Sequence, residues 1–404
     1  MVKFTLNFIK TPAFLILVIL CAVVFISSCK KKQPLITWEK TYGGGSRDRA
    51  YSIKQAADKG YFVAAQTSSF GAGGYDYYVI RLDERGNKVW EKTFGGELTD
   101  IPRCIAMTPD GGCVVAGRSS SFSTGSNEIY IVKLDRNGNK NWEKVYGGNR
   151  SDDSWSIQQT ADGGYIVAGF TESTGVYDYD VYILKLDGNG ERMWDKTFGG
   201  AESDMAKSIQ QTADGGYIVV GSTESTGAGN DDVYILKLNA NGERMWDKTF
   251  GGAESDMANS VQQTADGGYI VAGFTKSFGT GGTDIYILKL DENGEQMWDK
   301  TIGGTQDDEA LSVHQNKDGS YICAGFIGAG GSTDMYLARL NDEDGSIRWE
   351  RTFGASGEDQ AYEVQQTVDG GFIVAGYTHS DDAIAVYDDD IYLLKLNRVG
   401  ELNQ

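Results

Sequence analysis

The sequence predicts an all-β protein, a seven-bladed β-propeller built from four-stranded antiparallel blades, and three observations support this fold class. Repeats of about 52 residues fill the 404-residue chain after its N-terminal segment. Each repeat contains four short β-type segments separated by turn sequences, which is the pattern of a propeller blade. One tryptophan marks each repeat: Trp38, Trp90, Trp142, Trp194, Trp246, Trp298 and Trp349.

The four β segments are clearest in the repeat that begins near Trp194. They cover residues 193–198 (MWDKTF), 206–212 (AKSIQQT), 217–223 (YIVVGST) and 233–238 (VYILKL). The third segment is a continuous run rich in β-branched residues, as expected of a strand that is buried on both faces. Tight turns at 213–216 and 239–242 contain residues that tolerate positive φ. No segment beyond the N-terminal one has an apolar period of 3.6 residues, so we expect no substantial helix there.

The two ends of the repeat region predict how the ring closes. The region begins with one isolated β segment, residues 36–41 (ITWEKT), and its last repeat has only three β segments. The first segment can supply the missing fourth strand. Closure of this kind hides the sheet edges that an open stack would expose, whereas a linear β-solenoid, the main alternative, would need capping ends.

The first 28 residues are predicted to be a signal peptide that is removed before folding. Lys3 and Lys10 precede an apolar run, 13–26, that is short for a membrane-spanning helix. The run ends in Ile26-Ser27-Ser28-Cys29, which resembles the lipobox of bacterial lipoproteins. An ordinary signal peptide and an uncleaved anchor are the alternatives.

The lipobox resemblance implies a domain organisation and a location. Cys29 would carry the acyl chains, residues 29–35 would form a lipidated tether, and residues 36–404 would form the propeller. Lys30 follows the cysteine where an aspartate would favour retention in the inner membrane. We therefore expect an outer-membrane lipoprotein of the bacterial cell envelope that touches the bilayer only through its acylated N-terminus, with the leaflet left open.

Charge and cysteine content narrow the range of partners. The formal net charge of −20 repels phosphate backbones, so we expect no nucleic-acid partner. Glycine is abundant (54 residues) and proline scarce (4 residues), in keeping with a turn-rich β protein. The predicted mature chain keeps an odd number of cysteines besides Cys29, namely Cys104, Cys113 and Cys323, so no disulfide framework is predicted. A disulfide between Cys104 and Cys113 is an alternative that the sequence does not decide. We expect the protein to be a monomer.

The order of the segments within a repeat carries a family resemblance. SIQQTADGGYIVAG followed by VYILKLD and NGxxxW resembles WD-type repeats, and LDxNGxxxW resembles the tryptophan-docking motif of quinoprotein (PQQ-like) propellers. The resemblance covers residues 36–404. The repeat pattern as a whole is similar to the Gly/Asp-rich propeller repeats of lipid-anchored bacterial proteins. It implies that each tryptophan packs against the neighbouring blade. The chain differs from the quinoprotein propellers in having seven units rather than eight. The interval from Asp187 to Trp194 is also one residue shorter than in their tryptophan-docking motif, so the resemblance does not imply cofactor binding.

Two sets of acidic residues recur and are predicted to lie in loops on the same face of the propeller. The first set, ten residues after each tryptophan, is Asp48, Asp100, Asp152, Asp204, Asp256, Asp308 and Asp359. The second set precedes the fourth β segment and comprises Asp76, Glu128, Asp180, Asp232, Asp284, Asp334 and Asp390. Such carboxylates could bind Ca²⁺ or a polyol. The preferred interpretation is that they cap loops by accepting backbone N–H bonds.

Two departures from the repeat are the candidate ligand or metal sites. An insertion in the last repeat, residues 379–390, concentrates the aspartates Asp381, Asp382, Asp388, Asp389 and Asp390 in one loop. Trp155 lies outside the tryptophan series, close to the acidic face, and could offer a stacking platform or belong to the core. The alternative for the insertion is a solvated loop without a ligand.

No motif points to catalysis. The two histidines, His314 and His379, belong to no recognisable catalytic pattern, and no nucleophile elbow or zinc-binding motif occurs. We expect a binding or scaffold module for an envelope protein or a glycan, without a cofactor. The alternatives are a carbohydrate- or metal-dependent enzyme and a quinoprotein-like dehydrogenase. The first would show a pocket with paired carboxylates, one of raised pKa, and the second a wide central pocket with basic and aromatic residues.

Overall fold

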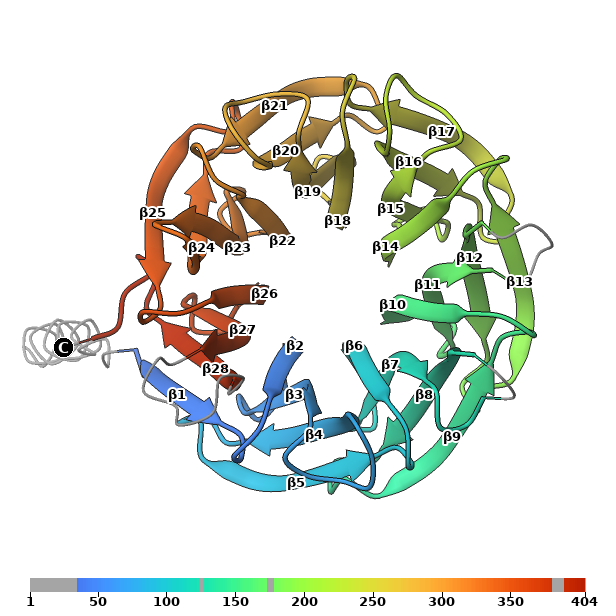
Figure 1. Cartoon of the computed structure of the whole chain (residues 1–404), viewed down its shortest axis with the longest axis vertical. Coiled ribbons are helices and arrows are strands. Elements are labelled where there is room, and N and C mark those ends of the chain that lie inside the picture. The colour runs from blue at the N-terminus through green and yellow to red at the C-terminus, as the bar shows by residue number, and fades with distance from the viewer. Residues whose placement is uncertain (1–34, 124–125, 173–177, 380–388, 404) are drawn as a thin grey trace, which may run out of the picture. The chain divides into compact units, whose positions relative to one another are not determined.

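The structure is a computed structural model, and it describes residues 35–123, 126–172, 178–379 and 389–403. The contacts within the chain divide it after residue 35, and the second unit comprises residues 36–404. The second unit is a closed ring of seven four-stranded antiparallel sheets, and its described residues form no helix (Figure 1). The predicted all-β, seven-bladed propeller is confirmed.

The strands occupy four concentric positions in the ring, and their bounds recur from blade to blade. The innermost strands are β2 (Asp48–Gln55), β6 (Asp100–Met107), β10 (Asp152–Gln159), β14 (Asp204–Gln211), β18 (Asp256–Gln263), β22 (Glu309–Gln315) and β26 (Asp359–Gln366). The second strands are β3 (Tyr61–Thr67), β7 (Cys113–Ser119), β11 (Tyr165–Thr171), β15 (Tyr217–Thr223), β19 (Tyr269–Thr275), β23 (Tyr321–Ala329) and β27 (Phe372–His379). The third strands are β4 (Asp76–Leu82), β8 (Glu128–Leu134), β12 (Asp180–Leu186), β16 (Asp232–Leu238), β20 (Asp284–Leu290), β24 (Ser332–Leu340) and β28 (Asp389–Leu396). The outermost strands are β5 (Lys88–Phe94), β9 (Lys140–Tyr146), β13 (Arg192–Phe198), β17 (Arg244–Phe250), β21 (Gln296–Ile302), β25 (Ile347–Phe353) and, for the last blade, β1 (Trp38–Tyr42).

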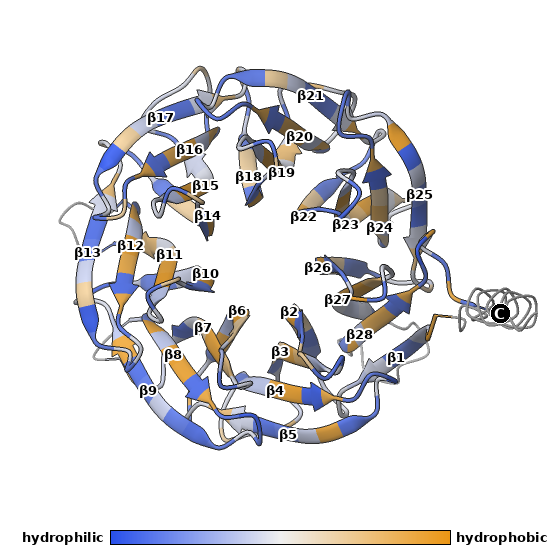
Figure 2. Cartoon of the chain, turned by 180° about the vertical axis from the view of Figure 1, so that it is seen from behind, coloured by the Kyte–Doolittle hydropathy of each residue, from blue (hydrophilic) through white to orange (hydrophobic). Residues whose placement is uncertain are grey.

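The N-terminal strand closes the ring, as the sequence predicts. β1 pairs antiparallel with β28, in the register from Trp38↔Lys395 to Tyr42↔Ile391, so the last blade is built from both ends of the repeat region. All seven sheets then have their outer edge formed by an equivalent strand. Figure 2 shows polar residues interspersed along these outer strands, as expected for strands that face solvent.

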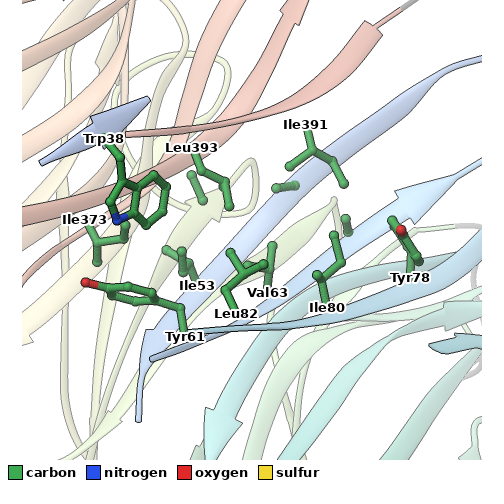
Figure 3. Packing of buried hydrophobic residues seen from close by; sticks show 13 residues of the cluster. Trp38, Ile53, Tyr61, Val63, Tyr78, Ile80, Leu82, Ile373, Ile391 and Leu393 are labelled. Atoms are coloured by element: carbon green, nitrogen blue, oxygen red, sulfur yellow. The ribbon is translucent and has the colours of Figure 1, made fainter. Parts of the chain in front are cut away.

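The hydrophobic core is divided into seven clusters, each shared by two neighbouring blades. In the cluster that seals the ring, Ile53 and Val63 of the first blade pack with Ile373 and Leu393 of the last, beneath Trp38 (Figure 3). The second and third strands are buried along most of their length, which explains their continuous β-branched and apolar sequence. Burial of this apolar surface between blades holds the ring together.

Each outer tryptophan also docks onto the turn of the next blade, as the quinoprotein resemblance implies. The indole Nε1 of Trp38 donates to the carbonyl of Glu84 at 3.1 Å, across the seam between the last blade and the first. In the middle of the chain the ring of Trp194 covers Gly242, which has a φ of +75°. A Cβ at Gly242 would lie 2.7 Å from the tryptophan ring, so both the positive φ and the docking require glycine here.

Every innermost strand contains a β-bulge at the same place. The register shift falls between Ala206 and Ser208 in the fourth blade, and equivalent shifts occur in the six others. A bulge leaves one residue outside the ladder pairing and redirects its side chain. The seven bulge residues are Tyr51, Arg103, Trp155, Lys207, Asn259, Leu311 and Tyr362.

Candidate functional site

The central channel of the ring is a cavity of about 560 Å³ lined by the innermost strands of all seven blades. All seven bulge residues line it. These strands surround the axis of the ring in Figure 1. The volume lies within the range of small-molecule sites in proteins, about 300–1,000 Å³.

The bulge position varies between blades, whereas the residues directly before and after it are mostly constant. The residue before it is alanine in five blades, and the residue after it is serine in five. The bulge position itself carries Tyr, Arg, Trp, Lys, Asn, Leu and Tyr in turn. Because the bulge turns these side chains towards the channel, the blade core does not dictate their identity. The channel therefore combines a symmetric scaffold with an asymmetric lining.

Five consecutive bulge residues form an arc of aromatic and cationic side chains, which we name the aromatic–cationic arc. The rings of Tyr362 and Tyr51 meet edge-on, with centroids 4.8 Å apart. The guanidinium carbon of Arg103 lies 5.4 Å from the ring centroid of Tyr51 and 4.0 Å from that of Trp155. The Nζ of Lys207 lies 3.5 Å from the Trp155 ring centroid. Both cations thus make cation–π contacts with the same indole.

The channel carries the opposite charge to the rest of the protein. Its lining residues include three cations, Lys54, Arg103 and Lys207, against one carboxylate, Glu363, so the lining has a formal charge of +2. The whole chain has a charge of −20. Lys54 and Glu363 form an ion pair, which leaves Arg103 and Lys207 as the excess positive charge.

Two buried carboxylates, Asp153 and Glu309, and one further guanidinium, Arg118, lie next to the arc. Asp153, which is 1% exposed, lies 3.5 Å from Arg103 and 3.9 Å from Arg118. Glu309 accepts a hydrogen bond of 2.8 Å from the amide of Asn259. Burial raises the pKa of Asp153 and of Glu309. Burial, followed by repulsion from Arg103, lowers the pKa of Lys207 to about 8, against attraction from Asp153, Glu309 and Asp231.

Glu363 also links two neighbouring innermost strands by hydrogen bonds. In other blades a serine hydroxyl at this position accepts a hydrogen bond from the next blade, as from Val261 N to Ser208 Oγ at 3.4 Å. Glu363 takes this place at the closing seam and accepts bonds from Ile53 N at 2.7 Å and from Ser52 Oγ at 2.6 Å. These bonds link neighbouring innermost strands around the channel, so the lining residues stand on a rigid frame.

His314 also lines the channel. Burial, reinforced by repulsion from Lys54, lowers its pKa to about 4. The imidazole is therefore neutral at neutral pH, and it contributes no charge to the channel there.

The first acidic set is buried, and its seven carboxylates make the same kind of contact. Each is at most 2% exposed and accepts a hydrogen bond of 2.7–2.9 Å from the backbone amide four residues earlier. In the fourth blade Asp204 accepts from Gly200 N at 2.8 Å and from Ser225 Oγ at 2.7 Å. Each of these carboxylates is therefore bonded to the backbone of its own loop.

The second acidic set meets the first at the glycine pair of each repeat. A Cβ on Gly251 would lie 2.2 Å from an oxygen of Asp232 and 2.6 Å from one of Asp256, so only glycine fits between the two carboxylates. Asp232 also accepts a hydrogen bond of 2.9 Å from Ala228 N. Burial, with a contribution from its first-set neighbour Asp308, raises the pKa of Asp284. Such carboxylate pairs recur from blade to blade, unlike the lining of the channel.

The insertion of the last repeat is described only in part. Asp381, Asp382 and Asp388 lie outside the described residues. Asp390 is paired with Thr378 in the β27–β28 ladder. Asp389 is 3% exposed, and its carboxylate lies 2.7 Å from Arg47 and 2.8 Å from Arg49 of the first blade.

His379 completes this group of residues at the seam. Its Nδ1 lies 3.0 Å from the Asp389 carboxylate. Two guanidinium groups and an imidazole therefore surround Asp389, an arrangement that provides ion pairing rather than the oxygen-rich shell that Ca²⁺ prefers. Among the described residues, no group of three or more His, Cys, Asp or Glu side chains could hold a metal ion.

The cysteines and the helix content can be stated for the described part of the chain. Cys104, Cys113 and Cys323 are free thiols, so the Cys104–Cys113 bridge is not formed. No helix among the described residues is long and apolar enough to cross a membrane.

Sequence reasoning identified Trp155 as a candidate but missed its neighbours in the arc. Trp155 attracts attention because it lies outside the tryptophan series, whereas Arg103 and Lys207 are ordinary surface-type residues in a β segment. The signal was present in the alignment of the repeats. The residue three positions after each first-set aspartate varies, while its immediate neighbours are mostly constant.

Comparison with known proteins identifies similarity to propellers. Residues 212–244 match a family described as a β-propeller domain of unknown function, DUF5122. The regulatory protein FlaEY of Caulobacter vibrioides is 23% identical over 291 residues, which cover 65% of this chain and 29% of that protein. The match therefore spans less than a third of the length of this relative.

Two solved structures extend the comparison. Chaetomium thermophilum Sqt1, bound to the N-terminus of the ribosomal protein L10, has a TM-score of 0.51 at 15% identity, over 88% of this chain and 98% of its own. The quinohemoprotein alcohol dehydrogenase of Comamonas testosteroni has a TM-score of 0.47 at 10% identity, over 91% of this chain and 78% of its own. These likenesses agree with the fold of the chain, a β-propeller of repeated blades.

Proposed function

We propose that this chain is a lipid-anchored protein of the bacterial cell envelope whose propeller binds an envelope protein or a glycan without catalysing a reaction. The observation that carries the proposal is the asymmetric lining of the central channel. Seven nearly equivalent strands present six kinds of side chain towards one cavity, and five of these strands form the arc from Tyr362 to Lys207. A repeated scaffold that presents varied side chains to a cavity is suited to recognition.

The relatives support a binding role at the level of the fold. Sqt1 is a propeller that was solved bound to the N-terminus of another protein. FlaEY is named a regulatory protein. Neither relative identifies the partner of this chain, so the partner has to be found by experiment.

A capture experiment tests the binding role. The soluble unit 36–404 is immobilised and exposed to an envelope extract and to a glycan array, beside a Trp155→Ala variant and a Met193→Ala control. Met193 lies on the outer strand β13 and is 58% exposed. The proposal expects a partner that the unchanged protein and the Met193→Ala control retain and the Trp155→Ala variant loses. Capture by none of the three proteins would count against a binding role.

The anchor is tested separately. Cells expressing the full chain are labelled with a radioactive fatty acid, beside Cys29→Ser and Cys21→Ser variants. Cys21 lies within the predicted signal peptide and serves as the matched control. We expect label in the unchanged chain and in Cys21→Ser, and none in Cys29→Ser. Label that persists in the Cys29→Ser variant would rule out acylation at this cysteine.

A quinoprotein-like dehydrogenase is the second candidate, and one observation favours it. Such an enzyme is expected to have a wide central pocket with basic and aromatic residues, and the channel contains Arg103, Lys207 and Trp155. The test adds pyrroloquinoline quinone, a primary alcohol and an electron-accepting dye to the purified chain. Dye reduction that requires both the quinone and the alcohol supports the enzyme; its absence supports the binding module.

A further inference from the structure

Three donor atoms of the aromatic–cationic arc have no acceptor among the described residues. Trp155 Nε1 and Arg103 Nε are buried and have no hydrogen-bond partner among the described residues. The Nζ of Lys207 contacts the Trp155 ring at 3.5 Å but makes no hydrogen bond or ion pair with the described part of the chain. All three residues line the same cavity. The ammonium of Lys207 has unused donor capacity beside the guanidinium of Arg103, and a ligand that supplies oxygen acceptors can use it.

The charge of the channel selects the sign of such a ligand. Lys54 is already paired with Glu363, so that pair contributes no net charge. Arg103 shares the buried Asp153 with Arg118, and Lys207 faces Glu309 only at a distance that gives no ion pair. The arc therefore keeps an excess of positive charge inside a protein whose total charge is −20. Arg103 and Lys207, which line the cavity, attract an anion, whereas Asp153, Glu309 and Asp231, which do not line it, offset part of that attraction.

The remaining walls set the size and character of the ligand. Tyr51 and Tyr362 present an edge-to-face aromatic pair on one side of the arc, and Leu311 adds an apolar side chain. The cavity volume of about 560 Å³ admits a small molecule rather than a folded domain.

From these observations we infer that the channel binds a small organic anion, with its carboxylate or phosphate oxygens accepting from Lys207 and Arg103 and its apolar part against the tyrosine pair. This inference rests on the proposed binding function and specifies its ligand class. Charge-assisted hydrogen bonds to an ammonium and a guanidinium are stronger than neutral ones, so Lys207 and Arg103 supply most of the affinity.

Calorimetric titration of the full chain with four probes tests the inference. Benzoate and phenyl phosphate carry both an anionic head and a ring, acetate carries only the head, and benzamide carries a ring without charge. We expect benzoate or phenyl phosphate to bind, acetate to bind more weakly, and benzamide not to bind. The better of the first two distinguishes a carboxylate ligand from a phosphate ligand.

Variants of Lys207 then locate the site. Lys207→Gln is expected to weaken binding of the better probe roughly tenfold or more, since it removes one charge-assisted bond. Lys207→Arg keeps the charge and is expected to stay within a few-fold of the unchanged protein. Lys92→Gln, an exposed lysine on the outer strand β5, is the matched control and is expected to change nothing. Thermal unfolding of each variant establishes that it is folded.

The result that overturns the inference is absence of binding by both ring-bearing anions at millimolar concentration, or equal binding by the unchanged protein and Lys207→Gln. This failure is distinguishable from failure of the proposed function. A partner captured equally by the unchanged protein and by Lys207→Gln would keep the binding role and remove the anion site. If no partner is captured but the anion binds, the anion site is kept and the proposed binding of a protein or glycan is removed.

Discussion

Arg49 of the first blade pairs with Asp389 of the last at 2.8 Å, so the two ends of the repeat region are joined by a buried charge as well as by strand pairing. Arg49 also lies 4.0 Å from the ring centroid of Tyr377. The sequence placed Asp389 in a candidate ligand loop. The structure places its carboxylate where it ties β28 to the start of β2, and this position makes the pair a test of how the ring is held closed.

Replacement of Asp389 by asparagine should destabilise the ring at this seam. The change removes the partner of two guanidinium groups that are largely shielded from water, and breaking a buried ion pair costs about 3–5 kcal/mol. Because both arginines keep some exposure, we expect the lower part of that range. Urea unfolding followed by circular dichroism measures it.

The matched control for the seam is Asp299→Asn. Asp299 lies exposed on the outer strand β21, and its carboxylate accepts a hydrogen bond from Gln296 that asparagine can keep. We expect a change within about 0.5 kcal/mol. Equal unfolding curves for Asp389→Asn and the unchanged protein would show that strand pairing and the shared apolar cluster close the ring without this ion pair.

Gly242→Ala should disrupt the docking of Trp194 on the next blade. The new Cβ would lie 2.7 Å from the indole, and the residue has a φ of +75°. Gly215→Ala is the matched control, since Gly215 has a φ of +83° but a Cβ added there would meet no atom within 4 Å. Both variants incur the backbone strain of about 1 kcal/mol. We expect Gly242→Ala to lower the free energy of unfolding by at least about 1 kcal/mol more than Gly215→Ala.

The fold could be predicted from the sequence because the same information is repeated seven times. The tryptophan spacing, the Asp-Gly turns and the three-strand last repeat all specify the same ring, and β1 pairs with β28 as expected. The functional site was harder to predict, because a β-bulge has no separate sequence signature here. Whether Lys207 faces the channel or solvent depends on one unpaired position in β14, and alternation alone assigns it no special place.

The two acidic sets are conspicuous in the sequence, unlike the residues that line the channel. Their regular recurrence makes them conspicuous in the sequence, yet recurrence is what a blade scaffold requires of its loop caps. Asp204 accepts its hydrogen bonds from its own loop and the neighbouring loop of its blade, and the bond from the amide four residues earlier is found at the equivalent aspartate of every blade. Recognition is instead expected where equivalent positions differ, as they do at Arg103, Trp155 and Lys207.

Asp204→Ala should destabilise the protein, and removal of calcium should not. The substitution leaves the amide of Gly200 and the hydroxyl of Ser225 without their acceptor, at a cost of about 2–3 kcal/mol. Since the carboxylate is already bonded within the protein, we expect a chelator to leave the thermal midpoint of the unchanged protein where it is. A midpoint that falls with chelator and returns with Ca²⁺ would favour the cation interpretation of the acidic sets.

Acid should weaken the Asp-Gly turns between the first and second strands of the blades, such as the turn that contains Asp214. Burial alone would raise the pKa of Asp214, but hydrogen bonds from Thr212 and Lys237 lower it to about 2. A lowered pKa means that this pair stabilises the protein above the pKa of the unfolded chain, near 4, and that the contribution is lost as the pH falls towards 2. Lys237→Met should therefore lower the thermal midpoint at pH 7, and the difference from the unchanged protein should shrink by pH 2. Lys92→Met, on the exposed strand β5, is the control.

The last prediction concerns the pH dependence of anion binding in the channel. Burial, then repulsion from Arg103, lowers the pKa of Lys207 to about 8, while Asp153, Glu309 and Asp231 act in the opposite direction. The ammonium is charged below that pH and neutral above it, so affinity for benzoate should be constant up to about pH 7 and fall as the pH rises through 8. Lys207→Arg should abolish this fall, because a guanidinium stays protonated throughout the range. Calorimetric titrations at pH 6.5, 8 and 9.5 measure both proteins, and parallel curves for the two would show that another group controls binding.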